Sequence, residues 1–304
     1  MVKSLAEGSI KQYNCELKKW WNFCKKENLD HLDVSVTNVL KCLTYEYNNN
    51  ASYGTLNSLR SAISLISSTD IGNDDSIKRF LKGVFKTRPT NPKYNHTWNP
   101  GQVLKFLSSK VPNDLISMEE LSKKVVTLLA LVTGHRMQTL SLIDRSNINE
   151  VEECIEIKIP DKIKTTAPNK KQPLLIIPKY TEDESICPFS ALKSYIQRTK
   201  NINSKSSKLL ISFKKPFNPV SAQTISRWIK DVLENSGVDT NIFSAYSTRH
   251  ASTSAAKRKG ISIDTIKSAA GWSKDSETFA KFYDKPLVKN QATEFGKAVL
   301  KNKT

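Results

Sequence analysis

Five motifs between residues 133 and 286 carry side chains that could bind a phosphate group. In chain order they are Arg136 in TGHRMQTL, a lysine-rich segment, Arg249 in YSTRH, Trp272 in AGW and Tyr283 in KFYDKP. A guanidinium group binds phosphate oxygens through paired hydrogen bonds, a geometry that a lysine ammonium does not offer. Taken singly, such an arginine is usually a surface residue and such a tyrosine is usually part of a core. The occurrence of all five together makes them a candidate site.

The charge balance predicts what such a site would bind. The chain has 47 Lys and Arg residues against 29 Asp and Glu, a formal net charge of +18 and a pI near 9.6. An excess of this size predicts an anionic partner, either a nucleic-acid backbone or an anionic membrane surface. No run approaches the roughly 18 apolar residues of a spanning helix, and residues 1–13 lack a signal-peptide core. Nucleic acid is therefore the expected partner, with no membrane.

Residues that could hold a metal ion or form disulfides are scattered. The five cysteines include no C-x-x-C pair, and the four histidines complete no zinc-finger spacing. Two acidic clusters, Asp74-Asp75 and Glu182-Asp183-Glu184, lie in loop-like polar stretches, which disfavours a metal-dependent integrase. We therefore expect no metal ion, no cofactor, free thiols and a reducing intracellular compartment.

Prolines indicate where the chain divides. Pro89, Pro92 and Pro100 fall among polar and basic residues in TRPTNPKYNHTWNP and indicate an interdomain linker. A chain of 304 residues is long enough for two domains. The expected parts are a first domain at 1–88, the linker at 89–100, a second domain at 101–286 and a C-terminal helix at 287–304.

The first domain has helical periodicity and many basic side chains. Leu56, Leu59, Ile63 and Ile66 repeat at the spacing of one helix face. A single cation on the opposite face is usually solvated surface, but their accumulation toward the end of the domain predicts a strip that follows phosphates. The candidate DNA-binding residues of this small all-helical domain are Lys18, Lys19, Arg60, Lys78, Arg79, Lys82, Lys86 and Arg88.

The second domain is predicted to be mainly α-helical with a small antiparallel sheet. Alternating apolar residues predict strands at CIEIKIP and PLLIIP, joined by a polar loop that carries Lys162 and Lys164. Helical patterns surround them. Ser247 or Thr248 can cap the helix that holds Arg249. A final short helix places Phe279, Phe282 and Tyr283 on one face, and Pro286 ends it.

The order of these motifs resembles that of the tyrosine recombinases, the phage-integrase class, and most closely the variants of eukaryotic mobile elements of the DIRS and Crypton kind. The resemblance covers nearly the whole chain, including SYGTLNSLRSAISLI and NHTWNP in its first part. It implies a two-domain clamp around double-stranded DNA, located in the nucleus. It also implies site-specific DNA cleavage and rejoining without metal or ATP, for recombination or integration of a mobile element.

The resemblance assigns roles residue by residue. Arg136 and Arg249 match the two arginines that bind the scissile phosphate, and Tyr283 matches the nucleophile that forms a 3′-phosphotyrosyl link. Lys164 in IKTTA is the expected general acid, with Lys162 as its rival and a further DNA-binding candidate. Trp272 stands where most members have histidine and some have tryptophan, and its indole N–H can donate to a phosphate oxygen.

Three positions depart from the family pattern. Tyr246 stands where the usual motif has the histidine of His-x-x-Arg, and a tyrosine is a poor base at neutral pH. Thr139 stands where bacterial and phage members often have Glu or Asp. Eleven positions separate Trp272 from Tyr283, about two more than in the compact phage pattern. The adjacent His250 is expected to point away from the site.

Two alternatives stay open, and both retain DNA as the partner. A domesticated recombinase would bind DNA without cutting it, and Tyr246 keeps that alternative in consideration. A type IB topoisomerase would share the arginine, lysine and tyrosine chemistry.

The terminal stretch 287–304 has Phe295, Val299 and Leu300 on one helical face. This apolar face must dock either on its own domain or on a neighbouring subunit of a tetrameric synapse.

Overall fold

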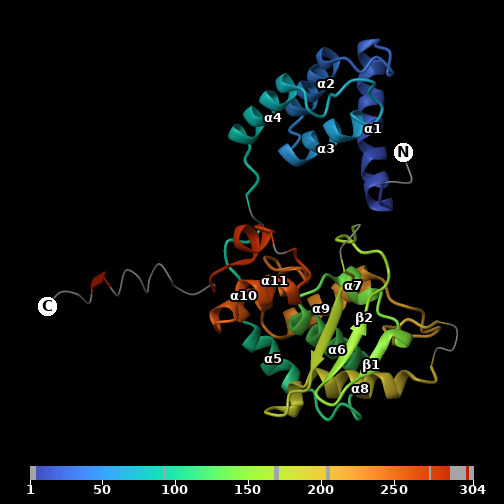
Figure 1. Ribbon diagram of the computed structural model, residues 1–304, viewed down its shortest axis with the longest axis vertical. Coiled ribbons are helices and arrows are strands. Elements are labelled where there is room, and N and C mark those ends of the chain that lie inside the picture. Colours follow the sequence, from blue (N-terminus) through green and yellow to red (C-terminus); the bar gives the residue numbers. More distant parts are fainter. Residues whose placement is uncertain are drawn as a thin grey trace. The chain divides into compact units, whose positions relative to one another are not determined.

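The computed structural model describes residues 5–91, 93–167, 171–202, 206–273, 275–287 and 299–300 of the chain. The chain divides into two compact units, Met1–Pro92 and Lys93–Thr304 (Figure 1). Each unit has its own hydrophobic core. Among the described residues, no helix is both long enough and apolar enough to cross a bilayer.

The first unit is helical throughout its regular structure. Its helices are α1 (Glu7–Glu27), α2 (Val36–Asn48), α3 (Tyr53–Ile63) and α4 (Asp75–Thr87). The side chains of Ser35, Ser52 and Asp74 accept hydrogen bonds from backbone N–H groups at the starts of α2, α3 and α4. Such caps satisfy donors that the first helical turn leaves free, which fixes where each helix begins.

Apolar stripes from these helices form the core of the first unit. Trp20, Leu43, Leu56 and Ile77 are almost fully buried in it, and the Trp20 Nε1–H donates to the backbone oxygen of His31 at 2.9 Å. The predicted face of α3 is confirmed through Ile63. It does not extend to Ile66, because α3 ends at Ile63 and the Ile66 side chain is exposed.

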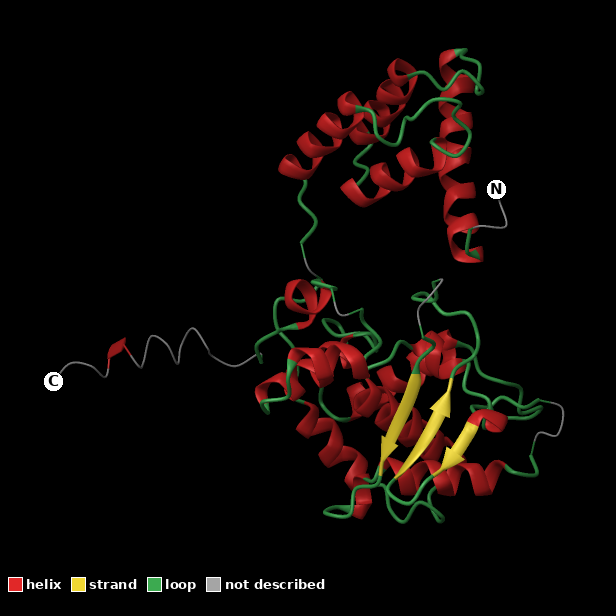
Figure 2. Ribbon diagram, in the orientation of Figure 1, coloured by secondary structure: helices red, strands yellow, loops and turns green. Residues whose placement is uncertain are grey.

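The second unit is mostly helical with a three-stranded antiparallel sheet (Figure 2). This architecture confirms the predicted fold class. The strand order is β1 (Ile148–Glu150), β2 (Cys154–Lys158) and β3 (Leu174–Pro178), with Ile155 opposite Ile177 and Ile157 opposite Leu175. Strand β1 was not predicted from the sequence, because its three residues are too few to show an alternating apolar pattern. The helices are α5 (Pro100–Ser108), α6 (Met118–Thr133), α7 (Met137–Ser141), α8 (Pro188–Thr199), α9 (Ala222–Asn235), α10 (Ser247–Arg258) and α11 (Ile263–Ala269).

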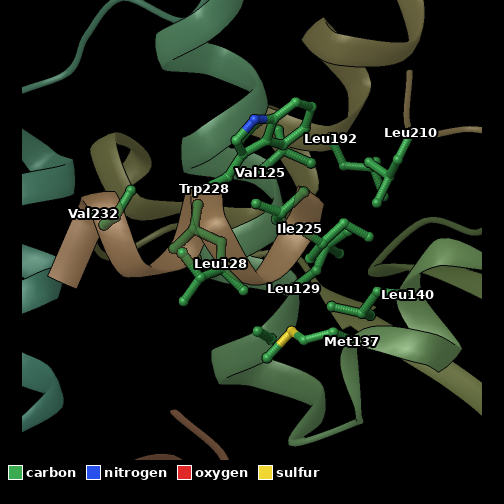
Figure 3. Packing of buried hydrophobic residues seen from close by; sticks show 14 of the residues in the cluster. Val125, Leu128, Leu129, Met137, Leu140, Leu192, Leu210, Ile225, Trp228 and Val232 are labelled. Carbon is green, nitrogen blue, oxygen red and sulfur yellow. The ribbon is translucent and has the colours of Figure 1, made fainter. Parts of the chain in front are cut away.

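Helix α6 is the centre of this unit. It contacts α7, α8, α9, α10 and the sheet, and it is buried over most of its surface. Figure 3 shows Val125, Leu128 and Leu129 of α6 packed among side chains of α7 and α9. Ser117 and Glu120 form a reciprocal capping box at its start. At its other end Gly134 is the C-cap residue, and the candidate site residue Arg136 follows two positions later.

Part of the segment expected as a linker packs into the second unit. Tyr94, Thr97 and Trp98 are all buried there, with exposed fractions of 4% or less. Prolines indicated irregular backbone correctly, but aromatic side chains between them supply enough apolar surface to be buried. Of the expected terminal helix, residues 288–298 and 301–304 lie outside the described residues.

Candidate active site

Arg249 lies in the first turn of α10, as the sequence predicted. The capping residue is Tyr246, which makes no side-chain cap, while Ser247 is the first helical residue rather than the cap. The Arg249 side chain is only 2% exposed, and its Nη1–H donates to the backbone oxygen of Gly134 at 2.6 Å. Gly134 has φ +57°, and a Cβ there would come within 3.3 Å of the Ala270 Cβ. A glycine is therefore favoured at the point where α6 ends against Arg249.

The Arg249 guanidinium keeps unused donors. Its Nε and Nη2 atoms are buried and have no hydrogen-bond partner among the described residues. The Trp272 ring covers the group, with Cζ 3.8 Å from the ring centroid, a cation–π contact. Burial, and next the charge of Arg136, lowers the pKa of Arg249 to about 10, so it is still charged at neutral pH. Buried donors without partners are costly, which indicates that this group is arranged for a ligand.

Arg136 is the N-cap residue of α7. It is half-buried, and its charge lowers the pKa of both Arg249 and His135. A charge shifts the pKa of a buried group in this way only at short range. The structure therefore brings together two arginines that are more than a hundred positions apart in the sequence.

Tyr283 ends a single π-helical turn, η4 (Phe279–Tyr283), and is 3% exposed. The Trp272 ring meets it edge to face, with centroids 4.7 Å apart, and Arg249 Cζ lies 5.4 Å from its centroid. Its backbone oxygen accepts a hydrogen bond from Ser254 of α10 at 2.6 Å. The expected three-residue face is wrong for Phe282, which is 46% exposed because the π-turn rotates it out of the cluster.

The hydroxyl groups of Tyr246 and Tyr283 are hydrogen-bonded to each other. Burial and then this bond raise the pKa of Tyr283, so in the free chain its side chain is a neutral phenol. Tyr246 is 44% exposed and connects the buried hydroxyl to solvent. The structure thus places Tyr246 beside Tyr283.

The expectation that His250 points away is wrong. Its ring stacks on that of Tyr283, with centroids 4.2 Å apart and planes 12° apart. Tyr283 comes from a later segment that folds back along α10, so the spacing within α10 alone did not show this contact. Burial lowers the pKa of His250 to about 4, which keeps it neutral.

His135 is a buried member of the site to which the sequence pattern assigned no role. This side chain is 4% exposed, next to Arg136 in the chain, and burial followed by the charges of Arg249 and Arg136 lowers its pKa to about 4. A Cβ on Gly271 would lie 2.8 Å from His135 Cε1. A histidine between a helix-ending glycine and an arginine was the available signal.

The lysines are not brought to the other residues by any contact in the described chain. Lys162 and Lys164 are exposed in the connection between β2 and β3, of which residues 168–170 lie outside the described part. Thr139 is buried in α7, where its backbone N–H donates to the Arg136 oxygen at 2.9 Å. The Trp272 Nε1–H is buried without a partner among the described residues.

Two of the basic candidates in the first unit serve its own fold. Arg60 donates to the backbone oxygen of Gly72, and Arg88 donates to that of Tyr47 while stacking on the Tyr47 ring. Lys19 pairs with Glu16 at 2.9 Å. The exposed candidates are Lys18, Lys78, Arg79, Lys82 and Lys86, of which Lys78 lies 3.8 Å from a carboxylate oxygen of Asp75.

No group of three or more metal-ligating side chains occurs within the described ranges. All five cysteines are free thiols. The site is therefore composed of guanidinium, phenol and indole groups, with neutral imidazoles packed around them.

The fold and the sequence of this chain are similar to those of known proteins. No curated protein matches the chain significantly. Among solved structures, the XerH site-specific recombinase bound to palindromic difH substrate, a post-cleavage complex, has a TM-score of 0.63 at 14% identity, covering 96% of this chain and 78% of that one. The Tn1549 transposon integrase in complex with transposon right end DNA has a TM-score of 0.57 at 15% identity, covering 88% and 85%.

A lambda integrase tetramer bound to a Holliday junction has a TM-score of 0.54 at 15% identity, covering 94% of this chain and 75% of that one. At such identities these likenesses establish a shared fold. The sequence itself matches the phage integrase family over residues 102–287, more than half of the chain. The chain therefore belongs to the phage integrase family, the tyrosine recombinases.

Proposed function

We propose that this chain is a site-specific recombinase that cuts and rejoins double-stranded DNA through Tyr283. The observation that carries the proposal is Arg249, a buried arginine whose Nε and Nη2 have no partner, next to Arg136 and within contact of Tyr283. Two guanidinium groups and a hydroxyl are the groups needed to hold and attack a phosphodiester. Neither metal nor nucleotide has a part in this chemistry.

In this reaction the guanidinium groups bind the non-bridging oxygens and stabilise the charge that develops in the transition state. The Tyr283 oxygen attacks phosphorus and gives up its proton through the half-exposed Tyr246 hydroxyl to water. The bond to the 5′-oxygen breaks, and Lys164 or its rival Lys162 supplies the proton that makes it a hydroxyl. Attack by a 5′-hydroxyl on the phosphotyrosine reverses these steps, so rejoining needs no ATP.

Binding of the phosphate requires a local rearrangement. Arg249 and Tyr283 are both nearly inaccessible, and Trp272 covers the guanidinium. We expect the Trp272 ring to swing aside or to present its unpartnered indole N–H to the same phosphate. The site is therefore closed in the free chain and opens on DNA.

We further propose the finer identity that the sequence resemblance implies. The chain would act in the nucleus on the ends of a DIRS- or Crypton-like mobile element. It would act as a tetramer, and the two domains of each subunit would close around the duplex. Exposed lysines on α4 and the net charge of +18 support DNA as the partner. Affinity should then fall steeply with salt, with a log–log slope of about −0.9 for each phosphate contact.

A second function is favoured by one observation. Tyr246 stands in the usual histidine position, and its hydrogen bond contributes to the raised pKa of Tyr283. This would suit a domesticated protein that binds DNA and no longer cuts it. The two functions differ in whether a covalent intermediate forms.

The experiment is selection of covalent adducts. The full chain is incubated with a library of nicked duplexes of randomised sequence, in which the cleaved fragment diffuses away and traps the phosphotyrosine. Denaturing gels should show an adduct with wild type and none with Tyr283→Phe. Retained DNA binding without any adduct would leave only the DNA-binding function. Relaxation of supercoiled DNA lacking the selected site would indicate a topoisomerase instead.

A further inference from the structure

Residues 94–98, hereafter the strap, open the second unit and contact both segments that carry the proposed reacting groups. These segments are the start of α10, which holds Arg249, and the residues that follow Tyr283. The contacts are hydrogen bonds and ring packing between groups about 150 or more positions apart in the chain. No sequence periodicity indicated them.

Trp98 fixes the first residue of α10. Its Nε1–H donates to the Ser247 hydroxyl at 2.8 Å, and both side chains are buried. The Ser247 hydroxyl in turn donates to the backbone oxygen of Ser244 at 2.7 Å. Because its hydrogen is committed, Ser247 can accept the indole N–H in one orientation only. Arg249 lies two residues further on.

Tyr94 contacts Tyr283, the proposed nucleophile, indirectly through the ring of His250. Its hydroxyl is hydrogen-bonded to the Ser244 hydroxyl at 2.8 Å and accepts the Ser244 backbone N–H at 3.2 Å. The Tyr94 ring meets His250 edge to face at 5.3 Å, and His250 stacks on Tyr283 at 4.2 Å. The strap therefore supports the ring on which Tyr283 lies.

Thr97 holds the backbone beyond the nucleophile. Its N–H donates to the Pro286 oxygen at 2.8 Å, and Thr97 forms a parallel bridge with Leu287. Pro286 is three residues after Tyr283. The strap thus binds the nucleophile's segment on one side and the arginine's helix on the other.

We propose that the strap is a positioning element for strand cleavage, with Trp98 and Ser247 as positioning residues that set Arg249 relative to Tyr283. This inference rests on the proposed function. The reacting groups come from different segments, and a misplacement of about 1 Å can reduce the rate by about a hundredfold. The Ser254 hydroxyl bonds the middle of α10 to the Tyr283 backbone oxygen. The strap instead fixes the first turn of α10, which carries Arg249.

The test is single-turnover cleavage of the selected nicked duplex at saturating DNA. Trp98→Phe keeps a buried ring and removes the N–H, while Ser247→Ala removes the acceptor. Each should lower the cleavage rate about tenfold, the scale of one lost hydrogen bond, with DNA affinity unchanged. The double variant should be no slower than Ser247→Ala alone, because Trp98→Phe removes a hydrogen bond that Ser247→Ala has already removed. Wild-type rates, or losses that multiply in the double variant, would overturn the proposal.

Trp228→Phe is the matched control. Trp228 is also a buried tryptophan of the second unit, and its ring stacks on that of Phe213 at 5.1 Å rather than on a ring of the strap. It should cleave at the wild-type rate. If Trp98→Phe does not fold, Tyr94→Phe tests the same element, since it removes only the hydroxyl that binds Ser244. A normal rate in Tyr94→Phe would then count against the strap.

A second readout separates this inference from the proposed function. Hydrogen exchange of the Thr97 amide, which donates to Pro286, needs no cleavage. Trp98→Phe should accelerate its exchange and that of α10's first turn, with Trp228→Phe unchanged. If wild type forms no adduct, the proposed function fails, and exchange alone decides whether the strap holds the two segments. Unaltered exchange would overturn the strap.

Discussion

The guanidinium of Arg249 lies over the Trp272 ring, with its Cζ 3.8 Å from the ring centroid. A tryptophan at this position therefore does more than offer an indole N–H. It covers the buried Arg249 charge, and the same ring contacts Tyr283, the proposed nucleophile. A histidine has a smaller ring and would leave more of the guanidinium exposed.

Tyr283→Phe should abolish the covalent adduct while leaving DNA binding intact. The change removes one oxygen and keeps the ring that packs against His250 and Trp272. The free energy of unfolding should fall by about 1 kcal/mol, because the Tyr246 hydroxyl loses its partner. Adduct gels and denaturant titration measure the two effects. An adduct that persists would mean that another residue is the nucleophile, and Tyr246 would be tested next.

Replacing either arginine by lysine should slow cleavage by at least about a hundredfold. Lysine keeps the charge and loses the planar pair of donors that matches two phosphate oxygens. Single-turnover rates of Arg136→Lys and Arg249→Lys measure the loss. The control is Arg227→Lys on the exposed face of α9, whose side chain bonds Thr224 of the same helix and which should cleave normally. Equal rates in all three variants would exclude a bidentate role.

Tyr246→Phe should shift the pH dependence of cleavage toward lower pH. The Tyr246 hydroxyl bond raises the pKa of Tyr283, after burial. Without it the pKa of Tyr283 falls, and the phenolate that attacks phosphorus forms at lower pH. A pH–rate profile under single-turnover conditions gives the position of the rising limb. A limb that does not move would show that Tyr246 has no influence on the nucleophile's ionisation.

The proposed general acid can be identified with a modified substrate. Lys164→Ala should slow cleavage of ordinary DNA, because the 5′-oxygen leaves without a proton. A substrate with sulfur at the bridging 5′ position should be cut at the same rate by variant and wild type, since a thiolate leaves unprotonated. Lys162→Ala is the matched control from the same connection. Rescue of that variant in place of Lys164→Ala would assign the role to Lys162.

Two buried histidines should make the fold sensitive to mild acid. The pKa of His135 and of His250 is about 4 in the folded chain, against 6.5 for an ordinary histidine. The unfolded chain therefore binds more protons below pH 6.5, and the free energy of unfolding falls as the pH drops from about 6.5 toward 4. At about pH 5 the loss should be roughly 2 kcal/mol for each histidine. Urea titrations measure it, and His250→Phe should reduce the loss, with the half-buried residue His31 of the first unit as a control site for the same substitution.

The sequence predicted what depends on local pattern. Apolar spacing located the helices, and alternation located β2 and β3, because those elements bury one face each. Motif order indicated Arg136, Arg249 and Tyr283, and the structure places these side chains near one another. The sequence pattern could not predict contacts between distant segments, such as the contact of His250 with Tyr283 or that of Trp98 with Ser247. Those depend on how η4 and the strap return to α10, which no spacing within one helix encodes.

The unpartnered donors of Arg249 also have a thermodynamic consequence for the chain as a whole. A buried cation without a counter-ion raises the energy of the folded state, and an anion that supplies the missing acceptors relieves this cost. Binding and folding are therefore linked, and the native state is more stable on its substrate than in free solution. If Arg249 has the proposed role, replacing it by an uncharged residue should raise thermal stability and abolish cleavage, a trade of stability for activity.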